Sequence, residues 1–275
     1  MSNVKIGVLG AGNMGGALLR GLLGSSYASP EHLRAADVDL TRLAQLAHEL
    51  EIQTTTEVET LARWAEVLVL AIKPQVANEL LQQLRSVVPA GTLVISVVAG
   101  LGTSTLESFF PEGVRVVRAM PNSPALVGAG MTAVAPGSRA TAEDLEQAHR
   151  LFDSVGRTVQ VEERLLNAVT GLSGSGPAYV LLAIEALADG GVSMGLGRAT
   201  ALLLAAQTVM GTAKMVLETG DHPARLKDSV VSPGGTTIAG LEALESAAVR
   251  HAFIAAVRSA AKRSAELGQA AARHG

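Results

Sequence analysis

Apolar stretches with two different periods alternate through the first 160 residues of the chain. Val4, Ile6 and Val8 indicate a strand over 4–9, and apolar residues at helical spacing predict a helix over 13–23. Several later strands are near-continuous apolar runs, which is typical of parallel strands buried on both faces. The pattern therefore predicts an α/β domain. Its further strands are expected at 33–37, 66–72, 92–98, 114–118, 131–135 and 158–161, and its further helices at 40–50, 76–87, 103–110 and 142–155.

A glycine-rich turn joins the first strand to the first helix. It spans Gly10–Gly15 and reads G-x-G-x-x-G directly after a buried strand. In this context the three glycines permit the tight turn, the approach of backbone to a pyrophosphate, and close packing of helix on strand. The helix start also offers N–H groups and a positive dipole end to phosphate. A Gly-rich loop of another α/β protein is the alternative, but the placement favours a Rossmann-type dinucleotide-binding domain.

An acidic residue ends the second predicted strand. Asp37 lies about 20 residues past the glycine run, where a carboxylate accepts a hydrogen bond from the ribose 2′-hydroxyl. A negative charge at this position disfavours a 2′-phosphate, so Asp37 favours NADH over NADPH. The alternative is that Asp37 or Asp39 is only the N-cap of the helix over 40–50.

Beyond residue 162 the strand pattern stops. Helices are expected at 163–169, 178–190, 198–218, 223–230 and from 235 to about 269, so the chain divides into an α/β domain over 1–162 and an all-helical domain over 163–275. Two loops here, Thr170–Pro177 and Val231–Thr237, present hydroxyls and backbone N–H groups before a helix. Such loops suit a carboxylate ligand, although tight interhelical turns with Ser/Thr caps are an equal alternative.

Composition narrows the possibilities. The net charge of −3 gives no basic field for nucleic acid, and the chain has no cysteine for disulfides or metal. None of the six histidines is paired at metal-binding spacing, so no metal is expected. A strand so near the N-terminus leaves no room for a signal peptide, and no apolar run of membrane-spanning length lacks glycine or charge, so we expect a cytoplasmic protein. A hydrophobic content of 48% is high for a chain of this size and points to an oligomer interface.

A missing base constrains the chemistry. A nicotinamide 3-hydroxyacid dehydrogenase needs a lysine after a Gly-rich turn, whereas the helix after Gly176 carries none in its first turns. Reduction of an already polarised C=N bond, which needs no strong base, fits better.

Motifs throughout the chain resemble the pyrroline-5-carboxylate reductase family. The most specific is LKDSVVSPGGTTIAGLEAL, which spans 226–244. The others are Gly7–Gly15, Ala71–Pro74, Val98–Gly100, Arg118–Pro124 and Gly171–Tyr179. The resemblance implies reduction of 1-pyrroline-5-carboxylate to L-proline with NADPH or NADH, the last step of proline biosynthesis. It also implies a Rossmann domain followed by a helical substrate-binding and dimerisation domain, and a homodimer often assembled into a decamer.

The resemblance also implies roles for particular residues. Thr237 is expected to donate a hydrogen bond to the ring nitrogen, and the substrate carboxylate is expected on the backbone N–H groups of Ser232–Thr237. The chain departs from many family members in its acidic segment Asp37–Asp39 and has Val58 where some carry Asn, so the cofactor preference stays open. The cofactor residues are expected to be Leu9, Gly10, Ala11, Gly12, Asn13, Met14, Asp37, Ala71, Lys73, Pro74 and Ala99, and the substrate residues Glu163, Ser232, Gly234, Gly235, Thr236 and Thr237.

Two other functions remain possible from the sequence. A related imine or 2-oxoacid reductase would use the same architecture on another small carboxylate, and activity on pyrroline-2-carboxylate would mark it. A non-catalytic dinucleotide-sensing module would bind cofactor without turnover, but the intact loop over 232–237 argues against it.

Overall fold

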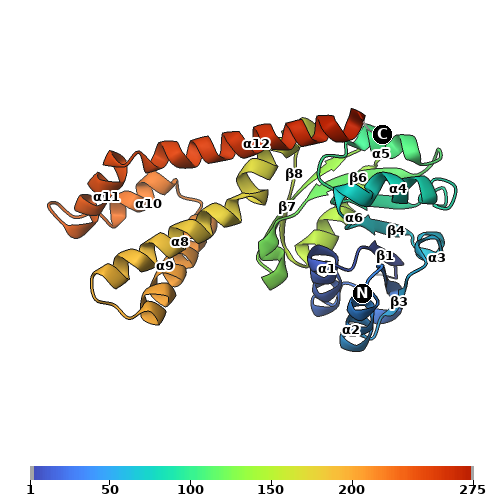
Figure 1. Ribbon diagram of the computed structural model, residues 1–275, viewed down its shortest axis with the longest axis horizontal. Helices are drawn as coiled ribbons and strands as arrows, with labels where there is room; N and C mark the ends of the chain where they lie inside the picture. The colour runs from blue at the N-terminus through green and yellow to red at the C-terminus, as the bar shows by residue number, and fades with distance from the viewer. Residues whose placement is uncertain (1–2, 274–275) are drawn as a thin grey trace. The chain divides into compact units, whose positions relative to one another are not determined.

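Residues 3–273 are described by a computed structural model, in which the chain forms two compact units (Figure 1). Unit 1 runs to Ser175 and takes in the chain again from Ser259, and unit 2 is Gly176–Arg258. The strands do end at Gln160, close to the boundary expected at 162. The units nevertheless divide later, because the segment after 162 packs on the sheet through the buried side chain of Leu166.

One mixed sheet organises unit 1. Within the described residues its eight strands follow the order β3-β2-β1-β4-β5-β6-β7-β8. Strands β1 to β6 are parallel and have the 3-2-1-4-5-6 order of dinucleotide-binding folds, whereas β7 is antiparallel to β6 and β8 is parallel to β7. The strand order reverses between β1 and β4, which places the ligand crevice at their carboxyl ends. The strands are β1 (Ile6–Leu9), β2 (Leu33–Ala36), β3 (Gln53–Thr55), β4 (Val67–Leu70), β5 (Leu93–Ser96), β6 (Arg115–Met120), β7 (Gly130–Pro136) and β8 (Gly156–Gln160).

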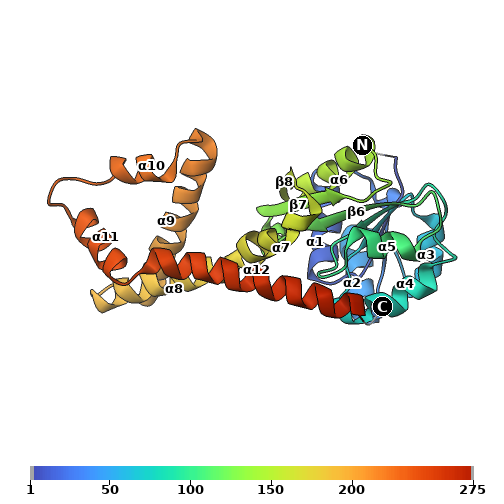
Figure 2. The ribbon, with the colours of Figure 1, turned by 90° about the horizontal axis from the view of Figure 1, so that it is seen from above.

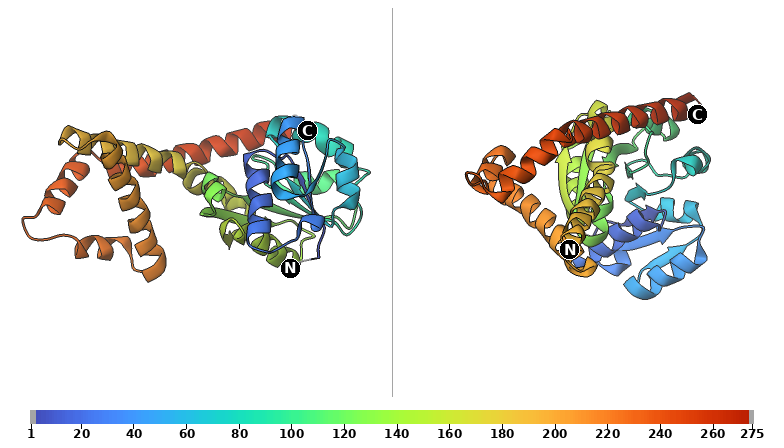
Figure 3. Two further views of the ribbon diagram at one scale, coloured as in Figure 1. Left: turned by 90° about the horizontal axis from the view of Figure 1, so that it is seen from below. Right: turned by 60° about the vertical axis from the view of Figure 1, so that its left-hand side comes forward.

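Helices cover both faces of this sheet (Figure 3). Alternate strand residues such as Val69 and Leu70 belong to two separate hydrophobic clusters, one on each face. Leu18 and Phe152 from the helices pack in the first cluster, and Leu81 packs in the second. The sequence prediction of an α/β domain is thereby confirmed. The first cluster is covered by α1 (Asn13–Gly24), α2 (Leu40–Leu50) and α6 (Ala142–Asp153), and the second by α3 (Val58–Trp64), α4 (Pro74–Leu84) and α5 (Thr103–Phe109).

The pattern analysis did not predict β3 and α3. The three residues of β3 are polar and partly exposed at the edge of the sheet, so they have no apolar alternation to detect. Only two residues separate β3 from α3, a helix of seven residues. Elements this short give too few periods for a recognisable signal.

Unit 2 is built from helices, with α8 and α9 packed together (Figure 2). Small residues permit their close approach: Ala188, Ala201 and Ala205 are buried, and a Cβ built on Gly191 would lie 3.3 Å from that of Ala201. His222 caps the short α10, as the His-Pro pair suggests, through a 3.2 Å hydrogen bond to its Nδ1 from the N–H of Ala224. The helices are α8 (Gly176–Ser193), α9 (Arg198–Thr219), α10 (Pro223–Ser229), α11 (Thr236–Ser246) and the start of α12 (Val249–Arg273).

The outer faces of α8 and α9 are strongly apolar. Leu181 and Leu203 are both more than 60% exposed in the single chain. Two helical stretches, Glu163–Ser193 and Arg198–Thr219, are long and apolar enough to cross a membrane by length and composition alone. An apolar surface of this extent needs another apolar surface to cover it.

Two expectations for the helical half are wrong in detail. The helix expected from 235 to about 269 is two helices, because Ala248 adopts a positive φ of 54° between α11 and α12. The loop expected over 170–177 is not a turn with free N–H groups. Residues Thr170–Gly174 form a π-helix (η4) in which the N–H of Ser175 donates to the carbonyl of Thr170 at 2.8 Å.

Candidate cofactor and substrate site

A cavity of about 400 Å³ opens at the carboxyl ends of β1, β2 and β4. It lies at the point where the strand order reverses, as expected for a nucleotide crevice. Six of the residues predicted to hold the cofactor line it together. They are Leu9, Gly10, Gly12, Asp37, Ala71 and Lys73.

The glycines of the first turn have different steric surroundings. Gly10 has a φ of 93°, and a Cβ on it would collide with the carbonyl of Ala71. A Cβ on Gly15 would collide with the carbonyl of Gly10. By contrast, nothing lies within 4 Å of a Cβ built on Gly12. Gly10 and Gly15 are therefore required by the fold, whereas Gly12 leaves open backbone that an incoming pyrophosphate can approach.

Asp37 is held at the mouth of this cavity by three donors. Its Oδ2 accepts from the N–H of Ala11 at 2.7 Å and from Nη1 of Arg42 at 3.1 Å, and its Oδ1 accepts from the N–H of Asp39 at 3.0 Å. Burial alone raises the pKa of Asp37, but the hydrogen bonds from Asp39, Ala11 and Arg42 outweigh it and hold the pKa below its ordinary value. Asp39, whose side chain accepts from the N–H of Arg42, is the N-cap of α2, so Asp37 is not that cap.

The mouth of the cavity also contains residues that the sequence did not single out for binding. Arg42 is 44% exposed, so its guanidinium reaches solvent while it pairs with Asp37. Val38 is 92% exposed, and Val76 and Leu80 add apolar lining. An exposed valine beside a cavity suits a flat aromatic ring such as adenine. Arg42 was missed because a lone arginine on a helix resembles any solvated surface residue.

A second cavity of about 330 Å³ lies on the other side of the glycine-rich turn. Asn13 and Met14, both predicted cofactor residues, line it from the start of α1. The rest of its lining comes from the loop after β6, from η2 (Ser123–Val127) and from the π-helix η4. The sequence assigns no role to the side chains of Arg118–Pro124, whereas the loop Thr170–Pro177 is expected to suit a carboxylate ligand or to form a capped turn.

Three predicted cofactor residues line neither cavity. Ala11 is buried, and its N–H is used by Asp37. Pro74 is the first residue of α4, and Ala99 is exposed in the loop between β5 and α5. Gly100, next to Ala99, has a φ of 84° and lies against Gly268 of α12, whose Cα is 3.4 Å from a Cβ built on Gly100.

Glu163 is fixed in unit 1 by one residue of α5 and one of β6. It begins η3 (Glu163–Leu165), and its two oxygens accept from the N–H and the hydroxyl of Thr103 at the start of α5, both at 2.6 Å. Nη1 of Arg118, in β6, lies 3.3 Å from Oε1. Its side chain remains 32% exposed, so the carboxylate can still accept another donor.

The other predicted substrate residues form one loop in unit 2. The N–H of Gly235 donates to the carbonyl of Ser232 at 3.0 Å, and Gly234 has a φ of 66°. Proline followed by a glycine of positive φ is the pattern of a type II turn. Helix α11 starts at Thr236, so the N–H groups of its first turn have no acceptor within the helix. Thr237 is partly exposed in that turn.

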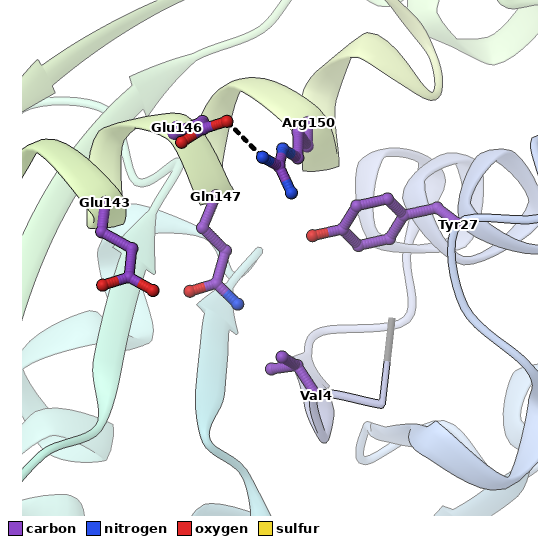
Figure 4. A pocket seen from close by; sticks show the side chains of 6 residues that line it. All are labelled: Val4, Tyr27, Glu143, Glu146, Gln147 and Arg150. Atoms are coloured by element: carbon purple, nitrogen blue, oxygen red, sulfur yellow. Dashed lines mark hydrogen bonds and ion pairs between the residues drawn. The ribbon is translucent and has the colours of Figure 1, made fainter. Parts of the chain in front are cut away.

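A separate hollow of about 210 Å³ lies between Val4, which precedes β1, and α6 (Figure 4). Tyr27 points into it, and Arg150 pairs with Glu146 across one turn of α6. Because it is at the amino end of β1, it is remote in the fold from the glycine-rich turn. No residue predicted to bind cofactor or substrate lines it. Among residues 3–273, no group of three or more His, Asp or Glu side chains could hold a metal ion.

Comparisons with known proteins agree along the whole chain. Residues 163–267 match the family model for pyrroline-5-carboxylate reductase dimerisation, and residues 5–100 match that for NADP oxidoreductase coenzyme F420-dependent. The pyrroline-5-carboxylate reductase of Methanosarcina acetivorans is 49% identical over 98% of this chain and 100% of that protein, and the one of Escherichia coli is 40% identical over 96% and 98%.

Solved structures give the same result. A pyrroline-5-carboxylate reductase from Coxiella burnetii superposes with a TM-score of 0.91 at 34% identity and covers 97% of this chain and 99% of that one. The Plasmodium falciparum pyrroline carboxylate reductase, solved with NADP bound, superposes with a TM-score of 0.86 at 32% identity over 98% and 99% of the two chains.

Proposed function

The chain belongs to the pyrroline-5-carboxylate reductase family, and from that premise we propose how its residues carry out the reaction. The protein is an NAD(P)H-dependent oxidoreductase that reduces 1-pyrroline-5-carboxylate to L-proline. Once its ring nitrogen is protonated, the cyclic imine needs only a hydride at the imine carbon, which is C2 of the pyrroline and becomes C5 of proline, to form the secondary amine. The protein therefore has to bind and orient the substrate and the cofactor, and it does not need a strong base.

The cofactor is assigned to unit 1. The pyrophosphate meets the open backbone at Gly12 and the start of α1, where N–H groups and the helix dipole favour an anion. The cavity beside Asp37 would hold the adenosine half, and the exposed Val38 would offer it an apolar contact. Asn13 and Met14, on the lining of the second cavity, would hold the nicotinamide half. When bound, the reduced nicotinamide supplies the hydride.

The substrate is assigned to the loop Ser232–Thr237. The type II turn and the start of α11 present N–H groups of which several have no acceptor in the helix, and these suit the substrate carboxylate. The hydroxyl of Thr237 donates to the ring nitrogen as the amine lone pair develops. The observation that carries this assignment is the geometry of the turn, in which Gly234 with its positive φ leads the chain directly into the first turn of α11.

Assembly follows from the exposed apolar helices. The family model for dimerisation covers them, so the protein forms an oligomer through its helical region, and the substrate is a small molecule. We extend this to a homodimer in which a second copy covers α8 and α9, further assembled into a decamer in the cytoplasm, with no membrane or nucleic-acid partner. The apolar helices then serve protein contacts rather than a bilayer.

The test of the substrate site is a pair of substitutions at one position. Thr237→Ala removes the donor and should lower kcat by roughly ten- to a thousandfold, whereas Thr237→Ser keeps the hydroxyl and should retain most of the activity. Oxidation of NADH and NADPH is followed separately with 1-pyrroline-5-carboxylate. Unchanged kinetics in Thr237→Ala would remove the residue from the mechanism. Turnover of pyrroline-2-carboxylate instead of the 5-carboxylate would point to the related imine reductase.

A further inference from the structure

A π-helical turn interrupts the helix that leads out of unit 1. Residues Thr170–Gly174 lie between α7 (Leu166–Val169) and α8, and the N–H of Ser175 reaches back five residues to the carbonyl of Thr170. π-Helical turns are rare, and they occur frequently at functional sites because the extra residue bulges from the helix. This one has Thr170, Gly174 and Ser175 on the lining of the second cavity.

One side chain ties this turn to the strands. Asn122 follows β6, and its Nδ2 donates to the carbonyl and to the hydroxyl of Ser173, both at 3.2 Å. Its Oδ1 accepts from the N–H of Met131 in β7 at 2.8 Å. The orientation of the amide is fixed by these partners, because the N–H of Met131 requires an oxygen and the carbonyl of Ser173 requires a donor. Neither a carboxylate nor an alkyl side chain can make both sets of bonds.

The position of the turn matters because it forms a wall of the second cavity. Asn13 and Met14 line the cavity from the glycine-rich side. On the other side, Gly174 lies so near Met120 that a Cβ on it would be 3.1 Å from that side chain's Cε. A shift of the π-helical turn would therefore change the width of the cavity directly.

We propose that Asn122 is a positioning residue for hydride transfer. Its hydrogen bonds to Ser173 hold the π-helical turn in place. The position of this turn fixes the cavity wall that contacts the nicotinamide end of the cofactor. The inference rests on the proposed function, which assigns the nicotinamide half to this cavity. Asn122 acts through Ser173 and Gly174 and supplies no proton or electron pair.

The test compares two amides of the same kind on neighbouring segments. Asn122→Ala removes the tie to the π-helical turn. The control, Asn167→Ala, removes the amide of α7 that accepts from the hydroxyl of Ser264 at 2.8 Å, outside both cavities. Each variant is assayed with saturating NADH and NADPH, and the primary deuterium isotope effect is measured with cofactor labelled at C4.

The expected result separates positioning from stability. Asn122→Ala should lower kcat by about 100-fold, since misplacement by about 1 Å costs that much. Its isotope effect should rise because hydride transfer becomes more rate-limiting, and its KM for the cofactor should change by less than about threefold because the adenosine cavity is intact. Asn167→Ala should lose thermal stability with kcat within about twofold of the parent.

Two outcomes would overturn the proposal: a kcat for folded Asn122→Ala within twofold of the parent, or an equal loss of kcat in both variants. If Asn122→Ala does not fold, Ser173→Ala, which removes one of the two acceptors, should still show a smaller loss of kcat with a raised isotope effect. An unchanged Ser173→Ala would then decide against the proposal. Failure of the proposed function is distinguishable, because it would appear as a parent enzyme that is folded and inactive on 1-pyrroline-5-carboxylate.

Discussion

The ion pair between Asp37 and Arg42 at the mouth of the first cavity permits a test of the proposed cofactor assignment, in which two substitutions should act in opposite directions. A cofactor with a free 2′-hydroxyl suits the carboxylate of Asp37, and one with a 2′-phosphate suits the guanidinium of Arg42. Asp37→Asn removes the negative charge and should raise kcat/KM for NADPH relative to NADH. Arg42→Ala removes the cation and should lower that ratio.

The expected size of each change in the cofactor ratio depends on how far the substituted charge is exposed to solvent. A charge-assisted hydrogen bond contributes about 1.5–3 kcal/mol, which corresponds to about ten- to a hundredfold in affinity. Arg42 is 44% exposed, and solvent screening therefore places its effect near the lower end, at about tenfold. Arg85→Ala, which removes an exposed arginine that lines neither cavity, is the control for a general change of charge and should leave the ratio unchanged.

Asp37→Asn should also weaken the fold, because the carboxylate is only 9% exposed and accepts two backbone N–H bonds. The amide keeps one acceptor oxygen, so the N–H of Ala11 or of Asp39 loses its partner, at a cost of about 1–3 kcal/mol. The pKa of Asp37 is held below its ordinary value of 3.8, so this contribution is present above pH 3.8 and is lost as the pH falls through the folded-state pKa.

Both parts are measured on the same proteins. Steady-state kinetics with each cofactor gives the ratio, and urea unfolding from pH 7 down to pH 3 gives the free energy of unfolding. The parent and Asp37→Asn should differ at pH 7 and converge as the pH falls below 3.8. If the ratio of kcat/KM for NADPH to that for NADH is unchanged in both variants, Asp37 and Arg42 do not discriminate between a 2′-hydroxyl and a 2′-phosphate. If the unfolding free energies are equal at pH 7, the carboxylate does not hold the glycine-rich turn.

Three further predictions test other parts of unit 1. The Cβ of Gly12→Ala meets nothing within 4 Å, so this variant should leave the free energy of unfolding unchanged and raise the KM for cofactor at least tenfold. The Cβ of Gly15→Ala collides with backbone, so this variant should destabilise the fold by about 2 kcal/mol or more. Urea unfolding and steady-state kinetics measure the two effects. Glu163→Gln weakens two hydrogen bonds of 2.6 Å at the start of α5 and should lower the free energy of unfolding by about 1.5–3 kcal/mol. A raised KM for the imine would also support a contact between Glu163 and the substrate. An unchanged KM would show that the residue only stabilises the fold. Gly268→Leu should displace the loop at Gly100 and thereby raise the KM for cofactor. Gly268→Ala should be tolerated, because its Cβ would lie 3.4 Å from the carbonyl oxygen of Gly100. Equal KM values for the two variants would refute the prediction.

The sequence could indicate which residues gather at the cavity beside Asp37 because the signals for that cavity are local. The buried strand, the three glycines and an acid at the end of the next strand lie within Ile6–Asp37, and the strand order brings their ends together. Arg42 could not be found in this way. Its direction is set by the N-cap at Asp39, which fixes where α2 begins, and only then does the guanidinium meet Asp37.

The second cavity was less predictable because the geometry of its wall depends on a break in helical periodicity. Gly171 and Gly174, with serines between and after them, are poor helix formers, so the segment resembles a loop in sequence. In the structure it stays helical with one extra residue per turn, held from outside by Asn122. A tie across 51 residues has no local signal, and the asparagine itself resembles any turn residue between two prolines.

The apolar composition of the chain predicts a covered surface but does not locate it on the helices of unit 2. Helices α8 and α9 are apolar around most of their circumference, which is typical of helices that are covered on all sides. Their own chain covers only the stripe around Ala188 and Ala201 and leaves leucines such as Leu182 and Leu203 exposed. The apolar surplus in the composition is therefore concentrated where the dimerisation family model matches, and the surface expected in an oligomer interface lies on these two helices. Periodicity alone could not locate it, because a helix that is apolar on every side does not indicate which side its own chain buries.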